Sequence, residues 1–254
     1  YDPGFLQISG YTVKNFDEKS HGVQTMTQVL EKSLNTGAVL AMEKVGYDSF
    51  LNYAVSFRFG EKTEIDLDGE ATGQLDNLKT VPKNKLNYSA ASFGQGIAIT
   101  PIQLITAFSA LANGGKLYHP YIVDTIIEKD GTEKKTQPEI VAAPIKEETS
   151  RTVSRMLTSV VDNGFDKARI KGYDVAGKTG TAQIPDHNGG GYLADDQFIH
   201  DFVGFAPAYA PKFVILIKME RPKGIKFAAD SLSPVFGDMA QFLIRYFNIP
   251  PTRP

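Results

Sequence analysis

Apolar side chains recur at helical spacing early in the chain. The capping box Thr25-Met26-Thr27-Gln28 opens a helix that is predicted to stop at Ser33-Leu34-Asn35. A second helix follows, with Val39, Met42 and Val45 predicted on its buried side. The Ser-Leu-Asn triplet is therefore expected at a joint between two helices. There its polar side chains can either cap backbone groups or point into a cleft.

Two later helices carry strong start signals. Thr100-Pro101-Ile102-Gln103 combines an N-cap, a proline at the first helical position and a capping-box glutamine. Apolar residues then cover most of that helix, which predicts a buried central helix. Ser233 as N-cap and Pro234 at the first position predict a final helix. The predicted apolar face of this final helix consists of Val235, Phe236, Met239, Phe242, Leu243, Tyr246 and Phe247.

Strand patterns dominate the second half of the chain. Asp130-Gly131 predicts a hairpin, and a helix with apolar positions between 153 and 161 follows it. Strands are predicted at 202–205 and 213–219, after a long loop at 185–197 with Gly189-Gly190-Gly191 in its middle. This order of elements indicates an α+β fold: helices come first, followed by a hairpin, a helix, antiparallel strands and a covering helix.

The stretch around Lys178-Thr179-Gly180-Thr181 is short, rich in small residues and ends in strand formers, so it is predicted to be a strand. A glycine inside a strand sacrifices packing, and a common reason is close approach by a ligand backbone. An ammonium and two hydroxyls beside that glycine suit a carboxylate or a developing oxyanion. The plain alternative is a buried strand with a satisfied lysine.

Composition narrows the possible functions. The net charge of -2 and the lack of a basic run argue against a nucleic-acid partner. The chain contains no cysteine, which excludes thiolate metal sites and cysteine nucleophiles, and its four histidines lack metal-ligand spacing. We therefore expect no metal and no cofactor. The apolar runs are strand-sized and too short to span a bilayer.

Several motifs together resemble one family. Ser33-Leu34-Asn35 and Lys178-Thr179-Gly180 match the Ser-x-Asn and Lys-Thr-Gly motifs of penicillin-binding proteins, in the expected order. The stretch from Phe93-Gly94-Gln95-Gly96 through Leu104, continuing to Ala112-Asn113-Gly114-Gly115, strongly resembles the monofunctional, high-molecular-weight (class B) members. Taken by itself, that glycine-rich stretch could be simple helix-entry geometry. The resemblance covers essentially the whole chain, and it implies an antiparallel sheet flanked by helices plus a helical subdomain.

One motif of the family is missing. No serine in the chain is followed three positions later by lysine, although that tetrad carries the family's nucleophile and base. We therefore expect residues 1–254 to be the C-terminal greater part of one transpeptidase domain. The nucleophile segment is expected either upstream, together with a membrane anchor, or on a second chain.

The resemblance implies a serine-type D,D-transpeptidase that cross-links peptidoglycan stem peptides and is acylated by β-lactams. It implies catalytic roles for Ser33, Asn35 and Lys178, and substrate binding by Thr179, Gly180 and Thr181. We therefore expect the side chains of Ser33 and Asn35 to face Lys178 across a cleft. It also implies a place on the outer face of the bacterial cytoplasmic membrane, and possible contacts with other cell-wall synthesis proteins. A non-catalytic scaffold or β-lactam sensor of the same fold is the main alternative. A hydrolase of this fold is a third reading.

Overall fold

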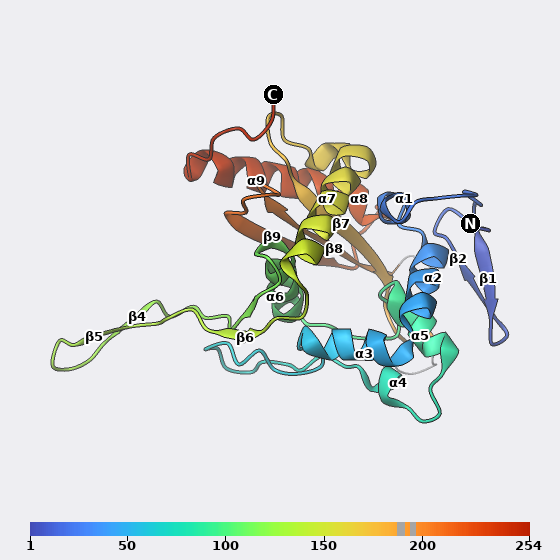
Figure 1. Ribbon diagram of the computed structural model, residues 1–254, viewed down its shortest axis with the longest axis horizontal. Coiled ribbons are helices and arrows are strands. Elements are labelled where there is room, and N and C mark those ends of the chain that lie inside the picture. The colour runs from blue at the N-terminus through green and yellow to red at the C-terminus, as the bar shows by residue number, and fades with distance from the viewer. Residues whose placement is uncertain (187–190, 194–196) are drawn as a thin grey trace.

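The computed structural model describes residues 1–186, 191–193 and 197–254. Its centre is a three-stranded antiparallel sheet in the order β7-β8-β9, formed by β7 (Ala176–Gln183), β8 (Phe198–Ala206) and β9 (Phe213–Glu220) (Figure 1). Helix α9 (Ser233–Tyr246) covers one face of the sheet, and α6 (Pro101–Ala112) lies against the other. The α+β prediction is confirmed.

The remaining elements surround this sheet. The long helix α7 (Glu147–Gly164) packs along β7. A helical subdomain buries Met42, Leu75, Leu78, Tyr88 and Ala91 as a separate core. The other elements are β1 (Phe5–Ile8), β2 (Tyr11–Lys14), α1 (Met26–Glu31), α2 (Asn35–Val45), α3 (Tyr47–Ser56), α4 (Asp76–Lys79), α5 (Lys85–Ser92), β3 (Leu117–Tyr118), β4 (Thr125–Ile127), β5 (Glu133–Lys135), β6 (Ile140–Ala142), a 3₁₀ turn (Asp166–Ala168) and α8 (Ala228–Ser231).

Both predicted capping boxes are present. The Thr25 and Thr100 side chains accept from the backbone N–H three residues on, and Gln28 and Gln103 return a side-chain bond to the cap. The predicted hairpin around Asp130-Gly131 is also confirmed, as the β4–β5 pair, which projects far from the rest of the molecule (Figure 1). The loop predicted at 185–197 lies partly outside the described residues, including Gly189 and Gly190.

The predicted burial of the second helix is only partly right. Val39 and Met42 are buried, but Val45 is 46% exposed. Each step of three residues in an α-helix falls about 60° short of a full turn. Val45 therefore lies about 120° round the helix from Val39, on the solvent side.

The prediction that α6 is a buried central helix is only partly right. Its fully buried residues are Gln103, Ala107 and Ala110, while its large apolar residues are partly exposed. One side of the helix, including Ile102 and Ile105, lines an open groove of about 400 Å³. Sequence periodicity describes the apolar character of a helix but does not show whether another element covers each side.

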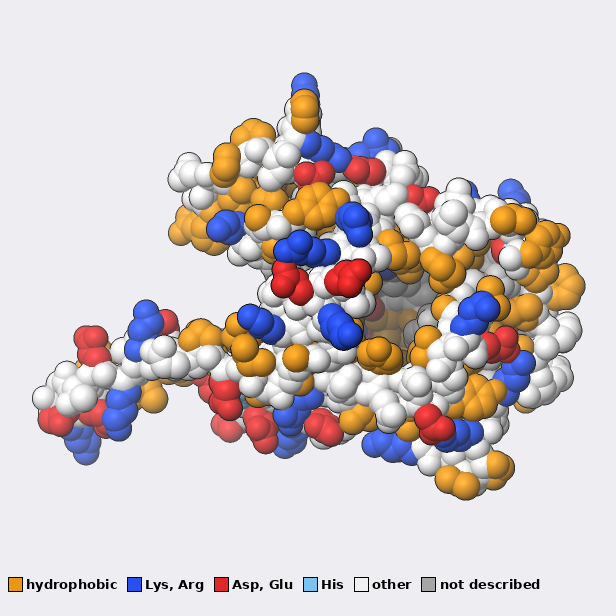
Figure 2. All heavy atoms as spheres, viewed as in Figure 1, with side chains coloured by type: hydrophobic (Ala, Val, Ile, Leu, Met, Phe, Trp, Pro, Cys, Tyr) orange, Lys and Arg blue, Asp and Glu red, His pale blue; other side chains and the backbone are white. Residues whose placement is uncertain are grey.

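The final helix packs on a different face from the predicted one. Phe236 is buried, but Phe242 and Tyr246 are 62% and 68% exposed, and Figure 2 shows apolar side chains gathered over α9. The buried face uses small residues instead: a Cβ at Gly237 would lie 2.6 Å from the Lys167 carbonyl oxygen. Small residues allow this close approach, and counting large apolar residues missed it.

The predicted cap of that helix is also wrong. Ser233 is the first helical residue and Leu232 is the N-cap, without a side-chain cap bond. The reason is local: α8 ends at Ser231, so the chain enters α9 with Leu232 already in a helical conformation. An N-cap needs extended backbone to aim its oxygen at the first turn.

Candidate active site

The joint between α1 and α2 presents the Ser33 hydroxyl to the sheet. Ser33 lies between the C-cap of α1 and the N-cap of α2, and its backbone has a positive φ of 51°. That conformation is uncommon for a residue other than glycine. The side chain caps neither helix. Its Oγ instead accepts a hydrogen bond from the Lys178 ammonium, 145 residues away in sequence.

The Lys178 ammonium is enclosed, although the residue as a whole keeps some exposure. It also donates to the Thr179 carbonyl, at 3.1 Å, and lies 5.5 Å from the centre of the Phe165 ring. Burial lowers the pKa of Lys178 to about 8. The physical cause is desolvation, which disfavours the charged form of an amine. The lysine can therefore both carry and release a proton near neutral pH.

Asn35 begins α2 and donates its side-chain amide to the Lys14 carbonyl at 2.8 Å. The contact predicted between Ser33 and Lys178 is thus present, whereas the described bond of Asn35 goes to the end of β2. This bond ties the site to the N-terminal hairpin. The amide of Asn35 still has a second N–H and an oxygen with which to meet a ligand.

The N-terminal hairpin is itself anchored by a buried carboxylate. Asp2 accepts from the Thr36 hydroxyl at 2.6 Å, the Asn15 amide at 3.0 Å and the backbone N–H of His21 at 3.0 Å. Burial pushes the pKa of Asp2 upward, but the hydrogen bonds from Thr36, Gly4, Asn15 and His21 outweigh it and lower the pKa. Because Thr36 is the second residue of α2, this network fixes the joint that carries Ser33.

Strand β7 lies at the edge of its sheet. In the described part of the chain its strand partner is β8, and the register pairs Lys178 with Val203 and Thr181 with His200. Successive side chains therefore alternate between the two faces, as expected. Lys178 and Gly180 lie on one face, and Thr179 and Thr181 lie on the other.

The two faces have different neighbours. On the first, Lys178 contacts Ser33. On the second, the Thr181 Oγ1 accepts from the Ala228 N–H at 3.0 Å, at the start of α8. Gly180 adds no side chain, and a Cβ there would meet Asp201 only at an ordinary 3.6 Å. Open backbone at an edge strand can pair with an extended peptide.

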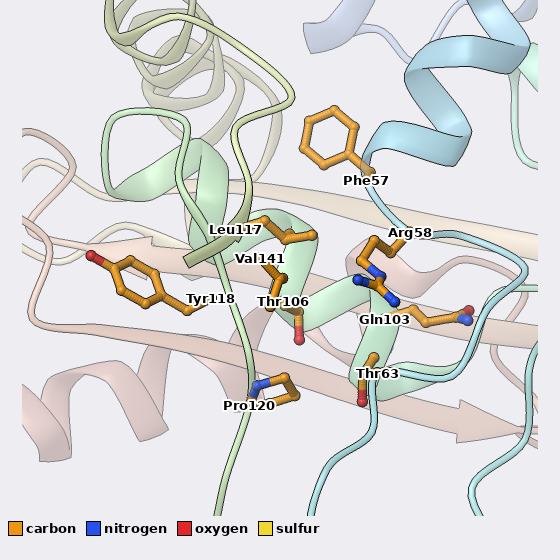
Figure 3. Close-up of a pocket in the computed structure, with 9 residues that line it drawn as sticks. All are labelled: Phe57, Arg58, Thr63, Gln103, Thr106, Leu117, Tyr118, Pro120 and Val141. Carbon is orange, nitrogen blue, oxygen red and sulfur yellow. The ribbon is translucent and has the colours of Figure 1, made fainter. Parts of the chain in front are cut away.

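Two cavities in the described part of the chain lie away from these residues. A small one of about 10 Å³, enough for about one water, is lined by Phe57, Thr63, Gln103 and Leu117 among others (Figure 3). The open groove of about 400 Å³ lies between α6 and the start of β9. Neither is lined by Ser33 or Lys178, and we assign the candidate site from hydrogen bonds and strand geometry. Among the described residues, no three His, Cys, Asp or Glu side chains form a potential metal site.

Sequence reasoning missed two contributors to the site. Phe165, just after α7, supplies the aromatic face against Lys178, and the Ala228 N–H holds the Thr181 hydroxyl. Phe165 belongs to no motif, and a backbone N–H has no residue signature. The sequence contains no signal that would have identified either contact.

Comparisons with known proteins agree with this arrangement. Residues 2–241 match the family model described as the penicillin-binding protein transpeptidase domain. The chain is 37% identical over 260 residues to stage V sporulation protein D of Bacillus subtilis, covering 100% of this chain and 39% of the relative. It is 30% identical over 250 residues to peptidoglycan D,D-transpeptidase FtsI of Escherichia coli, covering 96% of this chain and 39% of the relative. The chain thus spans about two fifths of the length of these relatives.

A solved structure shares the fold. Penicillin-binding protein 3 of Mycobacterium tuberculosis in complex with aztreonam superposes with a TM-score of 0.90 at 30% identity, covering 100% of this chain and 58% of that one. The predicted sheet flanked by helices, with a helical subdomain, is therefore confirmed. With its family match, its relatives and its fold in agreement, the chain belongs to the transpeptidase domain family of the class B penicillin-binding proteins.

Proposed function

We propose that this chain is the C-terminal greater part of a peptidoglycan D,D-transpeptidase domain. The observation that carries the proposal is the bond between the Ser33 hydroxyl and the Lys178 ammonium, made by segments 145 residues apart. A buried amine held against a hydroxyl beside an open strand edge suits acyl transfer, because such chemistry needs proton carriers next to a bound peptide.

In the proposed reaction, a serine oxygen attacks the carbonyl carbon of the penultimate D-alanine in a stem peptide. The peptide bond to the terminal D-alanine breaks, and that D-alanine leaves as an amine that has gained a proton. An amine of a second stem peptide then attacks the acyl-enzyme ester and regenerates the serine. The nucleophilic serine and its lysine base are assigned to a Ser-x-x-Lys tetrad that is not among these 254 residues.

Ser33 and Lys178 have a proton-handling role in this proposal. As an ammonium, Lys178 donates to Ser33 Oγ, and this leaves the Ser33 O–H free to donate to the leaving nitrogen. The pKa of about 8 keeps Lys178 mostly charged at pH 7 while making proton exchange easy. Its charge also favours the anionic donor peptide. Asn35 is assigned to the amide of the substrate.

The other side of β7 is assigned to the carboxylate of the substrate. The hydroxyls of Thr179 and Thr181 are assigned to donate to it, and the Thr181 backbone N–H is assigned as an oxyanion donor. Gly180 leaves room for the peptide to pair along the strand edge. β-Lactams carry a comparable anionic group beside a reactive acyl group, and a solved relative, penicillin-binding protein 3 of Mycobacterium tuberculosis, holds aztreonam in one structure and ampicillin in another.

We place the protein in the bacterial cell envelope, on the outer side of the cytoplasmic membrane, because its relatives include peptidoglycan transpeptidases. In the ranges that the structure describes, every helix is too short or too polar to cross a membrane. Other cell-wall synthesis proteins are possible partners in the same compartment.

The test is acylation of the full-length protein by a fluorescent penicillin. Lys178→Ala and Ser33→Ala should each slow acylation by at least about 100-fold, the usual worth of a positioned acid or base. Lys44→Ala and Ser49→Ala change the same residue types at exposed helix positions and should have no effect. Equal acylation in all four variants would falsify the site. A wild-type protein that binds the penicillin without covalent labelling would instead support the scaffold or sensor alternative.

A further inference from the structure

A buried histidine lies on the strand next to the proposed carboxylate-binding threonine, Thr181. His200 on β8 is the cross-strand partner of Thr181, so the two side chains share one face of the sheet. His200 is fully buried. Its Nε2 lies 3.0 Å from the Lys226 carbonyl oxygen, and its Nδ1 lies 2.8 Å from the Ser231 Oγ.

These partners fix the state of the ring. A carbonyl oxygen only accepts, so Nε2 carries the hydrogen and donates to Lys226. Nδ1 is then the acceptor for the Ser231 hydroxyl. Burial lowers the pKa of His200, against an opposing contribution from the bond to Lys226, and this favours the neutral ring. Both nitrogens are satisfied, as a buried polar side chain requires.

The two bonds bracket the segment that contacts Thr181. Lys226 and Ser231 stand on either side of Ala228, whose N–H donates to the Thr181 Oγ1 at 3.0 Å. That bond occupies a lone pair of the hydroxyl and leaves its O–H to donate elsewhere. The orientation of the Thr181 O–H thus depends on where residues 226–231 are held, and His200 holds both ends of that segment.

We propose that His200 is a positioning residue for carboxylate recognition. It clamps residues 226–231 onto β8, so that the Ala228 N–H turns the Thr181 hydroxyl toward the carboxylate of the acyl donor. His200 does not itself contact the substrate. The inference rests on the proposed function, because it assumes that Thr181 binds a carboxylate.

The first test compares two acyl donors on the full-length protein: benzylpenicillin and its methyl ester, which lacks the anionic carboxylate. His200→Leu removes both ring bonds and should slow acylation by the carboxylate form about tenfold, the worth of one hydrogen bond to a charged group, while leaving the ester nearly unchanged. His200→Gln can donate to Lys226 through its amide and should keep most of the preference.

The matched control is Ile215→Ala, which truncates a buried residue of β9 in the same sheet, where its cross-strand partner is Gly204. It should lower the melting temperature without changing the preference between the two donors. If His200→Leu slows both donors equally, His200 supports the fold only and the inference is overturned.

A second measurement needs no acylation. In wild type and His200→Gln, the Ala228 amide should exchange slowly with deuterium, because its N–H is held by Thr181. In His200→Leu its exchange should accelerate at least tenfold while the amides of β9 stay protected. If the Ala228 amide stays equally protected in His200→Leu, the inference is overturned, even when the wild-type protein is acylated normally. Absence of acylation in the wild type contradicts the proposed function instead, and the exchange result then decides the role of His200 separately.

Discussion

Replacing Lys178 by methionine should remove a large pH dependence from the stability of the folded chain. Burial lowers the pKa of this lysine from 10.5 to about 8. Between those values the unfolded chain binds the proton more strongly than the folded chain, so the stability of the wild type rises with pH across this window. Below pH 8 the folded protein carries the full cost of the buried charge.

The size of the effect follows from the shift. A difference of about 2.5 pKa units corresponds to about 3 kcal/mol, at about 1.4 kcal/mol per unit. Methionine is apolar, similar in length and does not titrate. The advantage of Lys178→Met over wild type should therefore shrink by about 3 kcal/mol between pH 7 and pH 10.5.

The assay is urea unfolding of the two proteins at intervals from pH 7 to pH 10.5. Titration of the other lysines and of the tyrosines is common to both proteins and cancels in the difference. Lys44→Met, at an exposed position on α2, serves as the control and should give a flat difference. A flat difference for Lys178→Met as well would refute the reasoning, because it would mean that the ammonium is not desolvated.

Three further outcomes are expected. Gly180→Val should block acylation by penicillin at little cost in melting temperature, since a Cβ at this position meets only ordinary contacts. Gly177→Val should instead unfold the protein, because a Cβ at that position would lie 2.8 Å from the Phe202 ring. Thr181→Ala should lower the affinity for the carboxylate of the donor, and Lys178→Ala should mainly slow the acylation step. Saturation kinetics separate the change in affinity from the change in rate. Identical changes in the two variants would contradict the assigned roles. Residues 1–254 alone should form no covalent adduct with penicillin by mass spectrometry, and a stoichiometric adduct on Ser33 would show that the nucleophile is misassigned.

Motifs located the site better than periodicity located the burial of the helices. Ser33 and Lys178 were predicted to meet, and they do. The prediction succeeded because the resemblance carries three-dimensional information that spacing alone does not. Asn35 shows the limit: its described bond to Lys14 depends on how the N-terminal hairpin folds back, and no local pattern encodes that.

The errors share a physical cause. The burial of Val45 and the packing face of α9 were predicted from the positions of large apolar residues. Burial, however, depends on which other segment of the chain packs against each side of a helix. α9 packs on the side of Gly237, where the lack of a side chain allows the backbone of another segment to approach. Phe165 and His200 were missed because they contact side chains of other elements, Lys178 on β7 and Ser231 on α8. Such contacts are set by tertiary structure.

At Ser33, the backbone conformation and the side-chain contact favour different residue types. A positive φ suits glycine, and holding serine there costs of order 1 kcal/mol. The hydroxyl that meets Lys178, however, cannot be supplied by glycine. Random substitution selected for stability alone would therefore tend to remove this serine, and selection for the proposed cross-linking activity would restore it. A stabilised variant obtained without an activity screen should be inspected at this residue first.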